Sequence, residues 1–527
     1  MADHNSTEPQ QFTAIPPEKD TTIDEKTANS PPRSSTSFIS PANQVDDAEQ
    51  TSVTASVLDE NNPMKQSLRE ILPTLFVLPH LMKKNVWIIL VFTSVVMMIY
   101  IWLYLGALWS PLTRVKNVEI LLYNDDAGFD FSQSPAQVVQ LMQSITHNST
   151  LGNIVESQIM DPQGQLSHIV LWADKTQEPG WDLASLTDYV EKGNAWGLVY
   201  IPANFSNNFL SYAPSNSGPA TTESVKVVDI QYIYDQGRSY STHSIVEKYV
   251  SRSLISLYNG IEKSLLTSAA NQTLLQTMYP SLWVQTIQTT EIIINPVLSY
   301  GQSFSTYVIF IVLYIGSIIA VVCICKYIPT TIETVGVLTF GAGSEEPIRK
   351  DSQIPKFPAL RIVLARYSIA MLFSFFHTIV IWMVPQVLHG HQMSSHYNAG
   401  VAFVFIWLVG ISFISILFFF AQLLTVDGFQ IPSTMFMIMM FTTSGGIIDW
   451  IVMPGFFRIG FAFPFTYGVK GLKAIYFGSL RDKMWINWLV VVAWIVVPSV
   501  ITMIMARSEI RLRREKLRRT ASVPSEV

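Results

Sequence analysis

The chain has 527 residues, of which 49% are hydrophobic and 14% are charged, whereas soluble globular proteins carry about 25% charged residues. Its mean hydropathy is +0.30, yet the N-terminal region is almost wholly polar, so the apolar residues must be concentrated further along. The formal net charge of -5 gives no overall basic field, which argues against a nucleic-acid partner. Two cysteines, Cys323 and Cys325, exclude a disulfide framework and a four-ligand zinc site. The composition therefore indicates an integral membrane protein.

Residues 1–62 are predicted to form a disordered acidic tail, with eleven acidic and three basic side chains. Such a segment cannot bury enough apolar surface to offset its chain entropy. Residues 63–85 mix apolar and polar side chains with prolines, so they are too interrupted to span a bilayer. We expect an interfacial helix that leads into the membrane, in preference to a plain linker.

Six apolar segments follow, each close to the roughly 20 residues that a membrane-spanning helix needs. None contains Asp, Glu, Lys or Arg, each of which would cost about 2.5–3.5 kcal/mol at the centre of a span. The fifth is the weakest, because Pro432 and the pair Gly445-Gly446 interrupt it. The sequence predicts an α-helical polytopic membrane protein whose six spans are 86–109, 304–325, 367–388, 399–424, 429–448 and 485–506.

Basic residues set the expected orientation, because cytoplasmic loops carry an excess of Lys and Arg. They precede the first span, occur in the connector 326–366 and recur in the tail 507–527. These segments share one side only if both termini are cytoplasmic, in the plasma membrane or in an endomembrane. Segment 449–484 disagrees, since it would be outside yet carries Arg458, Lys470, Lys473, Arg481 and Lys483.

Segment 449–484 is rich in aromatic residues, while Pro454 and Pro464 exclude one continuous helix. It is also too short for a pair of spans, which would need about 40 residues. We predict a hydrophobic hairpin of two short helices that dip into the outer leaflet, with their Lys and Arg side chains reaching the headgroups.

Residues 110–303 then form one extracytoplasmic domain, between spans one and two. Strand patterns alternate with helix patterns, which indicates an α/β module. The domain contains no cysteine, so core packing alone must stabilise it. The predicted strands are 118–123, 168–172, 196–201 and 225–234, and the predicted helices are 135–145, 183–192 and 242–270.

Candidate modification sites agree with this topology. Three N-glycosylation sequons, at Asn148, Asn204 and Asn271, lie inside the proposed outer domain. Some sequons arise by chance in a segment rich in Ser and Thr, so their placement is the informative part. Cys325 borders Lys326 at the predicted cytoplasmic interface and is a palmitoylation candidate, although a buried, inert thiol is the favoured interpretation.

The basic tail follows the last span directly. Such a cluster is expected to bind anionic lipids of the inner leaflet, each cation contributing about 1 kcal/mol. The alternative is that the tail only fixes topology. Its lipid-contact candidates are Arg511, Arg513, Arg514, Lys516, Arg518 and Arg519.

The sequence contains no G-x-S-x-G, H-E-x-x-H, C-x-x-C or phosphate-loop motif. His389, His391 and His396 share a short loop, but no carboxylate or thiol accompanies them, so a polar loop is favoured over a metal site. His377 lies within the third predicted span, where a hydrogen bond is favoured over a proton relay. We expect no enzymatic activity, no metal and no cofactor.

Several motifs resemble those of a known family. Asn117–Gly128 (NVEILLYNDDAG) and Gly193–Phe209 (GNAWGLVYIPANFSNNF) look like two strand-and-loop motifs in the outer domain of type-2 ABC exporter permeases. Phe463–Leu472 (FPFTYGVKGL) is similar to the same family's "P-x-T-Y" segment. One span, an outer domain and five further spans also match that plan, which phage-infection proteins share. With its acidic tail, Asp235–Tyr240 (DQGRSY) makes the chain resemble the fungal nitrosoguanidine-resistance membrane proteins.

The resemblance covers about residues 64–506 and implies a role in tolerance of toxic compounds, by export or by membrane-lipid organisation. The chain departs from ABC exporters because it has no nucleotide-binding domain. The expected partners are membrane lipids, small toxic compounds, and a separate ATPase or a second copy of the chain. The alternative is a non-transporting scaffold or sensor whose outer domain binds a ligand.

Overall fold

A computed structural model shows a mostly helical protein with a small mixed sheet. Within its described part, four helices are long and apolar enough to cross a membrane. The described residues are 84–108, 111–147, 149–161, 168–215, 226–268, 287–298, 300–331, 334, 358–388, 397–424, 426 and 428–521.

The sheet has five strands in the order β2-β1-β3-β4-β5. Strand β1 pairs in parallel with both β2 and β3, β3 pairs antiparallel with β4, and β4 pairs in parallel with β5. The parallel pairs require crossover connections, which the intervening helices supply. The strands are β1 (Glu119–Asn124), β2 (Leu171–Asp174), β3 (Gly197–Ile201), β4 (Val228–Asp235) and β5 (Ile287–Ile294).

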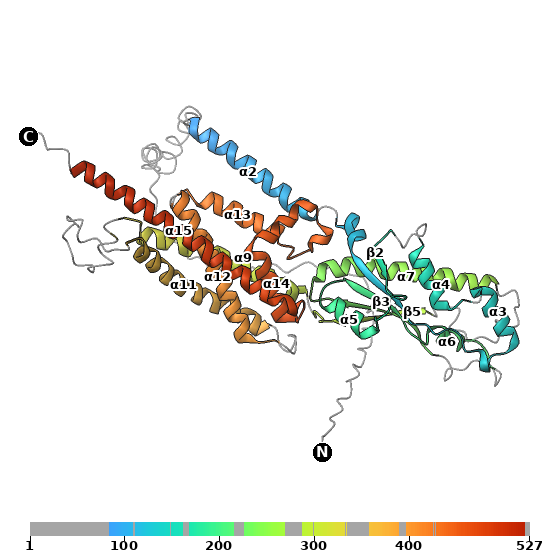
Figure 1. Ribbon diagram of the computed structural model, residues 1–527. Helices are drawn as coiled ribbons and strands as arrows, with labels where there is room; N and C mark the ends of the chain where they lie inside the picture. Colours follow the sequence, from blue (N-terminus) through green and yellow to red (C-terminus); the bar gives the residue numbers. More distant parts are fainter. Residues whose placement is uncertain are drawn as a thin grey trace, which may run out of the picture. The chain divides into compact units, whose positions relative to one another are not determined.

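Helices cover both faces of this sheet (Figure 1). One face, with Ile120 and Val199, packs against α3, α4, α6 and α7, while the other, with Leu121 and Leu198, packs against α5. Because neighbouring side chains on a strand point to opposite faces, a strand buried on both sides must be apolar throughout. The bounds are α3 (Ala136–Thr146), α4 (Leu151–Met160), α5 (Leu183–Glu191), α6 (Phe205–Leu210) and α7 (Tyr240–Ser268).

The sequence predicted most of this layout. The predicted strands 118–123, 196–201 and 225–234 correspond to β1, β3 and β4 within a few residues. Strand 168–172 is displaced, since β2 begins at Leu171. The sequence pattern did not reveal α4, α6 or β5, because α6 is a short helix and β5 is mostly exposed, without strict alternation.

Four of the six predicted spans lie in long apolar helices, namely α9 (Tyr300–Tyr327), α11 (Pro358–Leu388), α12 (Ala399–Leu424) and α15 (Met484–Ala521). The predicted first span lies in α2 (Lys84–Leu108), and among the described residues its stretch Ser94–Ala107 is apolar. The predicted fifth span contains α13 (Gln430–Thr443), whose 14 residues fall short of the roughly 20 that a span requires.

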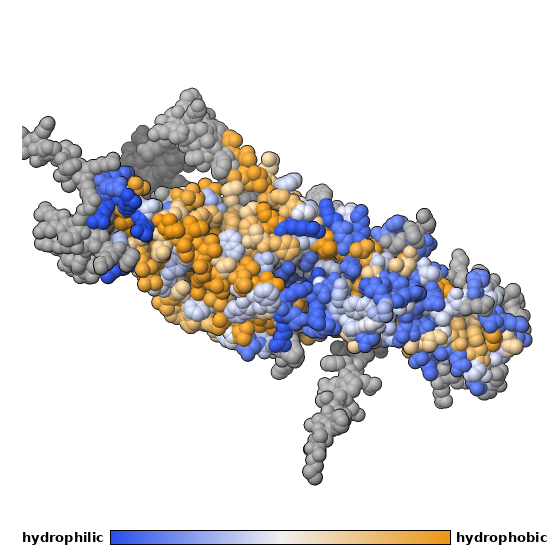
Figure 2. Space-filling model, in the orientation of Figure 1, coloured by the Kyte–Doolittle hydropathy of each residue, from blue (hydrophilic) through white to orange (hydrophobic). Residues whose placement is uncertain are grey.

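Helix α12 is the central element of the membrane bundle, because it packs against α9, α11, α14 (Pro464–Phe477) and α15. Small residues allow these close approaches. A Cβ at Gly410 would lie 2.6 Å from Ser374 Oγ, and one at Gly471 would lie 2.2 Å from the ring of Phe405. Figure 2 shows hydrophobic side chains gathered over the helices and hydrophilic ones over the sheet region. This division is the one expected for a bundle in lipid that carries a polar domain.

Candidate functional site

Asp235 ends β4 and begins the turn between β4 and α7, which contacts the end of α14. Its Oδ1 accepts hydrogen bonds from Gly237 N (3.1 Å), Asn295 Nδ2 (3.3 Å) and Ser479 Oγ (2.7 Å). Gly237 fits closely here, because a Cβ would lie 2.3 Å from Ser479 Oγ and 2.7 Å from the Cβ of Phe477. The turn therefore follows β4 directly and fastens to the end of α14.

Arg238, in the same turn, is held against the sheet region. Its guanidinium lies 3.8 Å from the ring centroid of Trp196, and its Nη1 donates to Ala195 O over 3.0 Å. Next to it, His243 is buried and stacks on Tyr234, with 5.0 Å between ring centroids. Burial and the nearby Arg238 cation lower the pKa of His243 to about 3, so this imidazole is neutral.

Two lysines of α14 meet the turn from the membrane side. The Lys473 ammonium donates to Arg238 O and to Gly446 O, each over 3.2 Å, and the side chain is only 5% exposed. The Lys470 ammonium lies 4.4 Å and 5.0 Å from the ring centroids of Trp450 and Phe461. Cation–π contacts of this kind stabilise a cation that has left bulk water.

Asp449 supplies a carboxylate to the same region. Its backbone N donates to Thr242 Oγ1 over 3.0 Å, and its Oδ1 accepts from Ile451 N over 3.1 Å. A small cavity, partly open to solvent, is bordered by Asp449, Ser479 and three cations. We call this set the polar junction; it comprises Asp235, Arg238, Asp449, Lys470, Lys473 and Ser479.

The charges of the polar junction are strongly perturbed by burial. Loss of solvation lowers the pKa of Lys470 and of Lys473 to about 8, although Asp449 acts in the opposite direction. Loss of solvation also raises the pKa of Asp235 to about 6, against the stabilising hydrogen bonds from Ser479 and Asn295. Near neutral pH the junction therefore holds more positive than negative charge in a poorly solvated place.

The structure shows what the predicted hairpin contacts. Segment 449–484 contains the short helices η6 (Gly455–Ala462) and α14, and the buried Lys473 ammonium donates to backbone carbonyls within the protein. Trp450 and Val452 belong to the core of the sheet region, while α14 is almost wholly buried in the bundle. Two of the basic residues that violate the charge rule, Lys470 and Lys473, were the signal for the site, because rings and backbone carbonyls contact them here. The other three, Arg458, Arg481 and Lys483, are exposed.

A second group of polar contacts joins the motif Asn117–Gly128 to the motif Gly193–Phe209. In the first motif, Asp126 Oδ2 accepts hydrogen bonds from Gly152 N (2.9 Å) and from Ser206 Oγ (2.5 Å) of the second motif. Its Oδ1 accepts from Ser206 N (3.0 Å) and Gly128 N (3.3 Å). One carboxylate thus caps the first turns of both α4 and α6, where backbone N–H groups lack partners within the helix.

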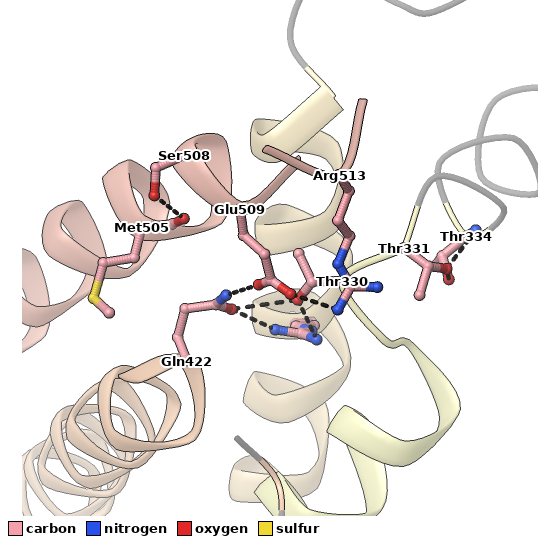
Figure 3. Close-up of polar contacts among 9 residues, drawn as sticks. Thr330, Thr331, Thr334, Gln422, Met505, Ser508, Glu509 and Arg513 are labelled. Carbon is pink, nitrogen blue, oxygen red and sulfur yellow. Dashed lines mark hydrogen bonds and ion pairs between the residues drawn. The ribbon is translucent and has the colours of Figure 1, made fainter. Parts of the chain in front are cut away.

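A third group of polar contacts lies where α15 leads into the basic tail, away from the polar junction. Arg366 is 5% exposed and donates to Ile328 O (2.8 Å), Thr330 Oγ1 (2.9 Å) and Gln422 Oε1 (3.2 Å). Glu509 of α15 accepts from Gln422 and from Arg513 (Figure 3). These contacts link α11, α12 and α15 to the segment that follows α9. We call this set the tail-end cluster; it comprises Thr330, Arg366, Gln422, Glu509 and Arg513.

Some sequence-predicted site residues can be placed individually. Asn204 is exposed, directly before α6, whereas Asn148 and Asn271 lie outside the described residues. Cys325 is 2% exposed in the bundle core, and Cys323 is exposed. The tail candidates Arg511, Arg513, Arg514, Lys516, Arg518 and Arg519 all lie in the last part of α15.

Two of the tail candidates already have acidic partners within their own helix. Arg511 and Arg513 form ion pairs within α15, with Glu515 and Glu509. His389, His391 and His396 fall outside the described residues. So do residues 63–83 of the predicted interfacial segment 63–85, whose last two residues begin α2. Within the described ranges, no three His, Cys, Asp or Glu side chains are grouped so that they could hold a metal ion.

Comparison with known proteins identifies a family and leaves its activity open. No curated protein and no solved structure matches this sequence. The family model described as "Protein of unknown function (DUF3533)" matches residues 89–500. That match runs from α2 into α15 and includes the sheet region and the polar junction. The chain therefore belongs to the DUF3533 family of proteins of unknown function.

Proposed function

We propose that this chain is a multi-pass membrane protein whose permease-like membrane domain raises cellular tolerance of toxic compounds. It acts by export or by organising membrane lipids, and both termini are cytoplasmic, in the plasma membrane or an endomembrane. The polar junction is the main support for this proposal. It connects the sheet region to α14, a helix buried in the bundle. A displacement of the sheet region is therefore transmitted to the membrane helices, and the reverse also holds.

The resemblance to type-2 exporter permeases supports the same function. Two of its motifs meet at Asp126 and Ser206, while the DQGRSY turn meets α14 at the junction. Motifs that make tertiary contacts with one another are more specific than isolated matches. In this proposal export is driven by a separate ATPase, or the chain acts as a homo-oligomer.

The test is to measure accumulation of a labelled alkylating nitrosoguanidine in cells with and without the chain. Export predicts higher accumulation and slower efflux after deletion, with recovery on complementation by the wild-type chain and by Gly301→Ala. Gly301 is a matched control, because a Cβ there would have no neighbour within 4 Å. Gly237→Ala, which disturbs the junction, should restore less efflux. Unchanged accumulation together with lost tolerance would rule out export and leave lipid organisation.

The proposed topology has its own test. Glycosidase treatment of the mature protein should increase its electrophoretic mobility, and replacing Asn148, Asn204 and Asn271 together with Gln should abolish that change. A mobility change that survives the triple substitution would contradict an extracytoplasmic sheet region.

A scaffold or sensor is the second candidate function, and one observation favours it. Strand β5 lies at the edge of the sheet and five of its eight residues are exposed, including Ile292 and Ile293 at 39% and 38%. An edge strand with free backbone groups is a surface on which a partner strand can add. Loss of tolerance upon Ile292→Lys, with normal efflux, would favour this function over export.

A further inference from the structure

The polar junction contains cations that its own carboxylates do not neutralise directly. Arg238, Lys470 and Lys473 border the cavity together with Asp449. Within the described part of the chain, none of these cations forms an ion pair with Asp449 or Asp235. Buried charge without a close counterion is costly, so the site favours the entry of an anion.

Lys470 is the cation with the least protein support. Its ammonium rests on the Trp450 and Phe461 rings, and among the described residues no oxygen accepts a hydrogen bond from it. Lys473, by contrast, donates to two backbone carbonyls. Rings attract a cation but satisfy none of its three N–H donors. These donors remain available to an acceptor in the cavity.

The donor set favours the oxygens of a phosphate group. Arg238 donates from Nη1 to Ala195 O and lies 3.8 Å from the ring centroid of Trp196, and these two contacts hold its guanidinium at the cavity wall. A planar guanidinium together with two ammonium groups supplies several charge-assisted donors, the arrangement that binds phosphate oxygens well. The single carboxylate in the lining, Asp449, repels an anion but leaves a net excess of positive charge.

The surroundings favour a phosphate that belongs to a lipid. Phe461, one of the rings beneath Lys470, is itself 44% exposed, and the neighbouring Phe456 and Ile459 are 56% and 43% exposed. All three side chains belong to η6, which reaches the junction through the contact between Phe461 and Lys470. Figure 2 shows that the apolar surface over the membrane helices gives way to a polar surface over the sheet region. A phospholipid offers both matching parts, acyl chains for the apolar surface and a phosphate for Lys470.

We infer that the polar junction is a binding site for a phosphate group, supplied by a phospholipid, with Lys470 and Arg238 as its principal donors. The inference goes beyond the proposed function and holds whether or not the chain transports anything. A bound phosphate balances the charge of the junction and links α14 to the DQGRSY turn. Lipid bound there stabilises the docking of the sheet region on the bundle.

The first experiment uses the unmodified full-length chain in detergent and follows acylation of its lysines by mass spectrometry. Added dioleoylphosphatidylglycerol should protect Lys470 from an amine-reactive anhydride, because the phosphate covers the ammonium. Lys483, which donates to Lys192 O and does not border the cavity, is the internal control and should react as before. Dioleoylglycerol, which has the same acyl chains and no phosphate, should protect neither lysine.

The second experiment measures lipid retention by native mass spectrometry. Lys470→Gln should weaken phosphatidylglycerol binding by roughly tenfold, the loss of one charge-assisted contact, while Lys483→Gln should leave it unchanged and Lys470→Arg should restore most of it. Equal losses for Lys470→Gln and Lys483→Gln, or equal retention of dioleoylglycerol, would overturn the inference. A parallel sample with inorganic phosphate identifies the source of the phosphate group. If inorganic phosphate protects Lys470 and the phospholipid does not, the ligand is a soluble phosphate and the lipid assignment is wrong. If the phospholipid protects Lys470 and inorganic phosphate does not, the ligand is a membrane lipid.

Discussion

Replacement of Asp126 by Asn should loosen α4 and α6 together, because this one carboxylate caps both helices. The carboxylate accepts four hydrogen bonds, two at each oxygen. An Asn side chain keeps one acceptor oxygen and turns an NH₂ group toward the Gly152 N–H or toward Ser206. Two charge-assisted bonds are lost, each worth about 1.5–3 kcal/mol when the acceptor is ionised. Since Asp126 is half-buried, solvent screens part of this, and we expect a loss of about 3 kcal/mol.

The assay is amide hydrogen exchange of the full-length protein in detergent, followed by mass spectrometry on peptides from α4 and α6. A loss of about 3 kcal/mol corresponds to roughly hundredfold faster exchange where amides exchange through local opening. Asp125→Asn is the matched control, because Asp125 is exposed and its carboxylate accepts one hydrogen bond, from Tyr200 OH over 3.2 Å. Unchanged exchange in Asp126→Asn, or an equal change in Asp125→Asn, would refute the capping role.

Three further predictions concern the junction and the tail-end cluster. Gly237→Ala should lower the thermal unfolding temperature of the detergent-solubilised protein, since its Cβ would lie 2.7 Å from the Cβ of Phe477; Gly301→Ala should not, and an equal effect would contradict the close-packing argument. Burial raises the pKa of Asp235 from 3.8 to about 6, so between these values the folded chain holds a proton that the unfolded chain releases. Stability should therefore fall by up to about 3 kcal/mol as the pH rises through this window, and Asp235→Asn should remove that dependence in urea titrations. Arg366→Leu should destabilise the helix bundle by roughly 2–4 kcal/mol, because the three oxygens that accept hydrogen bonds from Arg366 lose their donor. Arg366→Lys should recover only part of this stability, because one ammonium cannot reach all three oxygens. Full recovery with Lys would show that the charge alone matters.

Composition and periodicity were sufficient for the broad plan of this protein. A span of about 20 apolar residues has few alternatives in a folded chain, so the helices that contain 304–325, 367–388, 399–424 and 485–506 could be predicted directly. The buried strands β1 and β3 are apolar on both faces, and that pattern is equally local. The predicted span 429–448 shows the limit, because its apolar composition does not reveal that α13 ends at Thr443.

The candidate site depends on contacts that no local pattern contains. The sequence showed that Lys470 and Lys473 are basic residues in a segment predicted to lie outside, and it contained DQGRSY as a motif. Nothing in the sequence indicated that these lysines and this motif are in contact. Lys473 and Arg238 are 235 positions apart, and Ser479 and Asp235 are 244 apart. Hydropathy rules assume that an isolated Lys must reach water or headgroups. Tertiary structure decided otherwise here, because carbonyls and rings from distant segments replace the solvent that each charge has lost.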